Sequence, residues 1–88
     1  MDINTINNGW VNVYSLAGIT VGTGMEVQNK RSSNVITIQE RATAPSSDDF
    51  SGRLLRYCDV AEVWAGSPGV WVRGETSSIW LNVQEVPA

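Results

Sequence analysis

The sequence predicts an all-β protein, folded as a compact antiparallel β-sandwich or small barrel of about six or seven short strands. The 17 Val and Ile residues outnumber the 6 Leu and Met residues, and β-branched side chains fit pleated strands better than helices. Short runs alternate apolar and polar residues, and turn-forming residues separate these runs at intervals of about 8 to 12 residues. A length of 88 residues allows one domain.

The first alternating run covers residues 10–16, with Val11 and Val13 on one face. The Asn8-Gly9 pair in front of it is typical of a turn. Residues 1–9 are polar and rich in asparagine. We therefore expect a flexible amino-terminal arm over residues 1–9 and a single β domain over residues 10–88.

Residues 19–39 predict a hairpin. Its first run, 19–28, is interrupted by Gly22 and Gly24, where a strand bends or bulges. A polar connection over 29–34 leads into the second run, 35–39. The alternation places four side chains in the core: Met25, Val27, Ile36 and Ile38.

Residues 40–53 contain Pro45, three Ser and Gly52 without alternation, so they predict the longest loop. The adjacent acids Asp48 and Asp49 fit a solvated loop, and a hard-cation site is the alternative. The run 54–59 fits either a strand or one face of a short helix, and the strand is preferred.

A second hairpin is predicted where the runs 60–65 and 70–73 flank the turn-forming residues 66–69. This pairing sets Trp64 opposite Trp71 and Glu62 opposite Arg73, and matched cross-strand pairs stabilise a sheet. The last predicted strand covers residues 79–85, whose apolar residues alternate with Trp80 and polar residues.

Composition argues against most catalytic and cofactor chemistry. The chain has no His and one Cys, so it forms neither a disulfide within itself nor a Cys/His zinc site, and we expect no enzyme, no metal and no cofactor. Cys58 is expected to be a small buried residue.

The formal charge of -3, with no basic cluster, argues against nucleic acid as a partner. No apolar run approaches the length of a membrane span.

The candidate site is a face of three tryptophans, Trp64, Trp71 and Trp80, flanked by Glu62 and Arg73. Three interpretations stay open at this point. The rings pack in a second core, form an interface with another protein subunit, or stack on a sugar.

Several segments resemble the small all-β structural proteins of tailed bacteriophage particles, such as capsid decoration proteins and head or tail fibre bases. These segments are the glycine-rich stretch 16–24, the strand 25–29, and the ending 69–74 with 80–84. The resemblance implies a non-enzymatic virion component, synthesised in the host cytoplasm, for capsid decoration and stabilisation or as a head-tail accessory. Its partners would be other virion proteins and copies of itself. The alternative is a carbohydrate-binding module that holds host or environmental glycans on exposed tryptophans.

Overall fold

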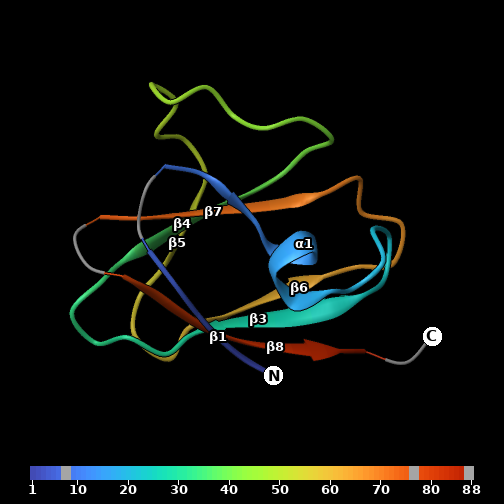
Figure 1. Cartoon of the computed structure of the whole chain (residues 1–88), viewed down its shortest axis with the longest axis horizontal. Coiled ribbons are helices and arrows are strands. Elements are labelled where there is room, and N and C mark those ends of the chain that lie inside the picture. Colours follow the sequence, from blue (N-terminus) through green and yellow to red (C-terminus); the bar gives the residue numbers. More distant parts are fainter. Residues whose placement is uncertain (7–8, 76–77, 87–88) are drawn as a thin grey trace.

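The computed structural model, which describes residues 1–6, 9–75 and 78–86, is a sandwich of two four-stranded antiparallel sheets (Figure 1). Sheet A has the strand order β1-β8-β3-β6 and sheet B the order β2-β7-β4-β5. The strands are β1 (Asp2–Thr5), β2 (Val11–Asn12), β3 (Met25–Asn29), β4 (Ile36–Glu40), β5 (Arg53–Leu55), β6 (Val60–Val63), β7 (Val70–Gly74) and β8 (Ile79–Glu85). The all-β prediction is confirmed.

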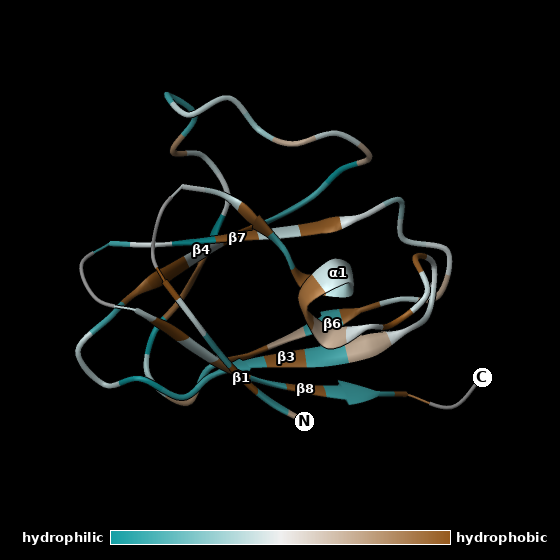
Figure 2. Cartoon of the chain, viewed as in Figure 1, coloured by the Kyte–Doolittle hydropathy of each residue, from teal (hydrophilic) through white to brown (hydrophobic). Residues whose placement is uncertain are grey.

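The core lies between the sheets, and two-residue alternation fills it. Along β8, Ile79, Leu81 and Val83 are buried while Trp80 and Gln84 are exposed, as the run 79–85 predicted. Figure 2 shows hydrophobic positions recurring along the strands, whereas the loop above sheet B is mostly polar. The four predicted core residues are buried too: Met25, Val27, Ile36 and Ile38. Burying each such side chain stabilises the fold by roughly 1.5–3 kcal/mol.

The run 10–16 was wrongly predicted as one strand, because it contains β2 and then the helix α1 (Val13–Ala17). The Asn12 side chain accepts a hydrogen bond from the Ser15 backbone N–H at 3.2 Å, which starts the helix. Gly18 ends it in the left-handed region, at φ 68°. In the view of Figure 1 the helix lies between β7 of sheet B and β3 of sheet A. It buries Tyr14, whose hydroxyl donates to the Thr23 carbonyl at 2.7 Å.

Both predicted hairpins are wrong, because each pair of runs lies in facing sheets. Strands β3 and β6 belong to sheet A, while β4 and β7 belong to sheet B. Two consecutive strands can bury their apolar faces side by side in one sheet, as a hairpin, or facing each other in two sheets. The alternation of apolar and polar residues is the same in both arrangements, so it does not distinguish them. The 64–69 connection bridges the layers: the Gly66 N–H donates to the Gly22 carbonyl at 2.8 Å, and the Gly69 carbonyl accepts from the Arg41 N–H at 3.0 Å.

The expected amino-terminal arm differs as well. Strand β1 pairs with β8, Ile3 is buried, and residues 2–5 are therefore an edge strand of sheet A. Residues 7–8 of that segment lie outside the described residues.

The chain between β4 and β6 forms a long loop, a short strand and a turn. The long loop is confirmed over residues 41–52. The strand preferred at 54–59 is confirmed for residues 54–55 only, because β5 ends at Leu55 and residues 56–59 form the turn into β6. Cys58 is exposed at φ 69°, contrary to the expected burial, because it forms part of the turn between β5 and β6.

No helix in the described part of the chain is long and apolar enough to cross a bilayer.

Candidate functional site

The predicted face of three tryptophans does not exist as one surface. Trp71 lies on β7 in sheet B, whereas Trp80 lies on β8 and Trp64 follows β6 in sheet A. Within sheet A, Val63 is opposite Met25, which is opposite Glu85. Glu85 is five positions along β8 from Trp80, about 17 Å at roughly 3.4 Å per residue, so Trp64 and Trp80 lie at opposite ends of the sheet.

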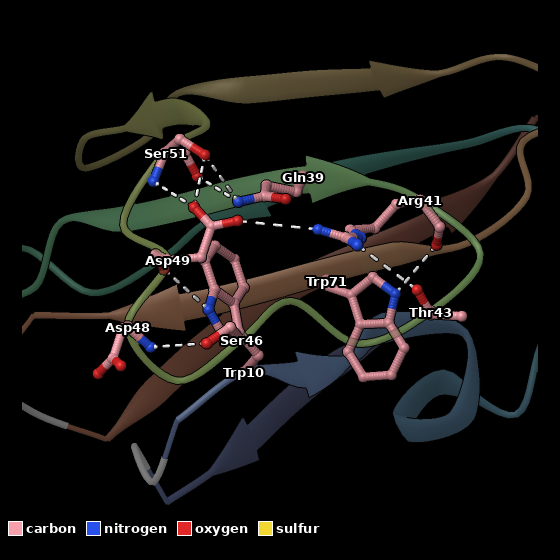
Figure 3. A network of polar contacts seen from close by, with 9 residues as sticks. All are labelled: Trp10, Gln39, Arg41, Thr43, Ser46, Asp48, Asp49, Ser51 and Trp71. Carbon is pink, nitrogen blue, oxygen red and sulfur yellow. Dashed lines mark hydrogen bonds and ion pairs between the residues drawn. The ribbon is translucent and has the colours of Figure 1, made fainter.

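Trp71 anchors the long loop 41–52 to the outer side of sheet B (Figure 3). Its indole N–H donates to the Arg41 carbonyl at 3.0 Å, at the start of the loop. The Trp10 indole N–H donates to the Asp49 carbonyl at 3.1 Å, near the loop's other end. A half-buried tryptophan ordinarily satisfies its N–H in this way, so Trp71 is explained by its role in holding the loop.

Arg73 serves the same loop. Its guanidinium donates to the Ser47 carbonyl at 2.6 Å and lies 4.2 Å from the centroid of the Phe50 ring. The predicted pair with Glu62 is absent, because β6 and β7 belong to different sheets and Arg73 is opposite Thr37 of β4. Arg73 therefore contributes to the loop and not to an open interface.

The acidic part of this loop is held by local hydrogen bonds. The pKa of Asp49 is lowered from its ordinary value mainly by the Ser51 hydroxyl, with the Ser51 N–H as the second cause. Arg41 adds an ion pair at 3.7 Å. Within residues 1–6, 9–75 and 78–86 no group of three or more acidic, Cys or His side chains gathers as metal ligands.

Trp80 already has a cation on its ring. The Lys30 ammonium lies 4.9 Å from the ring centroid and also forms a 3.0 Å ion pair with Asp2. The Asn82 amide donates to the same Asp2 carboxylate at 2.7 Å, and the pKa of Asp2 is lowered by these two hydrogen bonds. Trp80 is thus built into a polar network that joins β1 to β8.

Trp64 and Glu62 remain, and they line a groove of about 800 Å³ at the end of sheet A next to the 19–24 and 64–69 loops. We call it the Trp64 groove. Trp64 is 78% exposed, the most exposed large hydrophobic residue of the described chain. The groove is lined by Gly22, Thr23, Gly24, Met25, Glu26, Glu62, Val63, Trp64, Ala65, Glu85 and Val86.

The apolar part of the groove is a row of three residues across the sheet. The β3–β6 register, extended by one position, sets Gly24 opposite Trp64, and the Val86 N–H donates to the Gly24 carbonyl at 2.9 Å. A Cβ atom on Gly24 would lie 3.3 Å from the Ala65 nitrogen, so glycine permits the close approach of these backbones. The floor between the indole of Trp64 and the exposed Val86 therefore carries no side chain.

The neighbouring row is acidic. Glu62 lies directly opposite Glu26, which in turn lies opposite Gln84. A third carboxylate, Glu85, ends β8 and also lines the groove, but it lies opposite the core-facing Met25 and therefore on the other face of the sheet. None of the three takes part in an ion pair within the described part of the chain, where the ion pairs join Lys30 to Asp2 and Arg41 to Asp49.

The groove thus offers an open indole beside hydrogen-bond acceptors of negative charge. An indole stacks on flat groups and attracts cations, and carboxylates accept hydrogen bonds from basic or hydroxyl groups. Sequence analysis selected Trp64 and Glu62 but missed Glu26, Glu85 and Val86. Only the strand register brings these residues together, and the wrong hairpin had assigned Glu62 a different partner.

No protein family, curated protein or solved structure matches this chain.

Proposed function

We propose that this protein is a non-enzymatic structural subunit that docks on other proteins through the Trp64 groove. The observation that carries the proposal is the 78% exposed indole of Trp64 above an open groove of about 800 Å³. Tryptophan is concentrated in the centres of protein interfaces, where it fills a groove and loses its contact with water. Val86 and Val21, exposed near the same end of the sandwich, extend the apolar surface available to a partner.

The larger assembly that we propose is a bacteriophage particle, which the resemblance of the strands and glycine-rich turns supports. In that assembly the chain would serve in capsid decoration and stabilisation or as a head-tail accessory. Its partners would be other virion proteins and further copies of this chain. A small domain buries little apolar area by itself, and burial in an assembly adds stability at roughly 25 cal/mol per Å².

The test is co-sedimentation of the purified chain with bacteriophage particles assembled without it. We expect the wild-type chain to sediment with the particles and Trp64→Ser to stay in the supernatant. Trp80→Ser is the matched control, since it removes the same residue type from the opposite end of sheet A. Circular dichroism checks that both variants keep the β spectrum. Equal loss in both variants, or no sedimentation of the wild type, would contradict the proposal.

Glycan binding is the second candidate, and the exposed Trp64 indole on the same face of sheet A as Glu62 and Glu26 favours it. Sugars stack on such rings while their hydroxyls donate to neighbouring acceptors. A shift of the Trp64 indole signal on addition of a neutral oligosaccharide, with no sedimentation on particles, would favour the glycan-binding alternative.

A further inference from the structure

We infer that the occupant of the Trp64 groove is a basic segment of a partner protein, with an arginine side chain stacked on Trp64. The inference rests on the proposed docking function and adds the chemistry of the partner. Three observations carry it: the two opposed carboxylates, the open indole beside them, and the contrast with the Trp80 and Phe50 rings, which already hold cations.

The first step concerns charge. Directly opposed residues in an antiparallel pair have Cβ atoms about 4.5–5.5 Å apart, and like charges there destabilise the sheet. Glu62 and Glu26 are such a pair on the outer side of sheet A. A cation seated among them removes this repulsion, so the groove complements a basic group.

The second step concerns the indole. A guanidinium is flat, stacks on aromatic rings and donates hydrogen bonds to carboxylates from its edge. Trp64 and Glu62 both lie on the outer side of sheet A, two positions apart along the chain. One arginine can therefore lie over the indole and donate to the Glu62 carboxylate at the same time.

The third step concerns a contrast within the chain. Two other rings in the described residues hold a cation from the chain itself: Lys30 lies over Trp80 and Arg73 over Phe50. The Trp64 groove has the same combination of ring and carboxylate, as at Trp80 and Asp2, but its cation is not supplied by the described chain. A partner would supply it.

The test measures arginine-peptide binding and the stability of the free chain, because the inference predicts that removing the Glu62 charge weakens the binding and raises the stability. Two-dimensional NMR of the ¹⁵N-labelled chain follows the indole N–H signals during titration with a peptide of two arginines separated by glycine, and with its glutamine twin. We expect the arginine peptide to shift the Trp64 signal, assigned by its loss in Trp64→Ala, and high salt to weaken the effect.

Glu62→Gln should weaken arginine-peptide binding about three- to fivefold, as expected for one exposed charge pair, while raising the urea midpoint of the free chain because the repulsion is gone. Glu75→Gln is the matched control. It removes the same charge just past β7, at the end of sheet B away from the groove, and should leave binding unchanged.

Equal shifts with both peptides, or equal weakening by Glu62→Gln and Glu75→Gln, would overturn the inference. If Trp64→Ser still abolishes particle sedimentation in that case, docking stands and only the basic partner is wrong. If neither peptide binds and a neutral oligosaccharide shifts the Trp64 signal, the docking function fails together with the inference.

Discussion

Asn29 is a buried polar side chain whose removal should cost a large part of the stability. It ends β3 with no exposed surface and makes three hydrogen bonds, one of them to a residue 26 positions away. Its amide nitrogen donates to the Asn34 carbonyl at 2.7 Å and to the Leu55 carbonyl at 3.0 Å. Its amide oxygen accepts from the Arg31 N–H at 3.0 Å. The side chain thereby joins sheet A to β5 of sheet B.

The expected cost of Asn29→Ala follows from these bonds. Each hydrogen bond contributes a net 0.5–1.5 kcal/mol, and buried carbonyls left without donors add to the loss, so we expect about 3–5 kcal/mol. A chain of this length has a total free energy of unfolding of roughly 4–13 kcal/mol. The variant should therefore lose a substantial part of the free energy of unfolding and unfold at a clearly lower urea concentration than the wild type.

Urea unfolding followed by tryptophan fluorescence measures the loss. Gln28→Ala is the matched control, because Gln28 precedes Asn29 on the same strand and makes one exposed bond, to the Cys58 carbonyl at 3.4 Å. We expect that control to cost less than about 1 kcal/mol. If Asn29→Ala lost no more stability than Gln28→Ala, the three buried bonds would not stabilise the sandwich as argued.

Three further predictions concern stability. Gly69→Ala should destabilise the chain by about 1–3 kcal/mol in urea, because the added Cβ would lie 2.4 Å from the Arg41 carbonyl oxygen; an unchanged midpoint would show that the 64–69 connection moves freely. Tyr14→Phe should cost about 1 kcal/mol through loss of the bond to the Thr23 carbonyl, measured by thermal melting, and a neutral result would contradict that bond. Because the folded-state pKa of Asp49 is lowered below 3.8, its contribution to stability is present above that pH and is lost as the pH falls through the lowered pKa. Asp49→Asn should therefore flatten the acid limb of a stability-pH profile, Asp48→Asn should not, and equal limbs would refute the role of the Ser51 bonds.

For β3, β4 and β8 the sequence patterns predicted which side faces the core but not which sheet the strand joins. The alternation of β8 gave Ile79, Leu81 and Val83 correctly, because one buried face fixes the period of two. Nothing in the runs 60–65 and 70–73 shows that they face each other across the core, since that choice depends on the other strands competing for each edge. The helix start at Asn12 was missed because a five-residue helix is too short to show its own period.

The candidate site was also predicted only in part. The exposed Trp64 was selected from composition and alternation, whereas its carboxylate neighbour Glu26 comes from a strand 36 positions earlier than Glu62. A pairing over that separation is set by the whole sheet order, which local patterns do not contain.

The position of β8 in sheet A has a consequence for how the chain folds. Although β8 is the last strand along the chain, it lies between β1 and β3. The β1–β8 and β3–β8 pairings therefore form only after β8 is present. Closing β1 onto β8 joins residues about 80 positions apart, which costs chain entropy before any contact repays it. Sandwiches held by such distant pairings fold in milliseconds to seconds. Before β8 pairs, β3 has an unpaired edge, and Met25 and Val27 lack their neighbours from β8 in the core. A ribosome-bound or truncated chain without β8 would therefore expose an aggregation-prone edge and apolar surface that the complete sandwich buries.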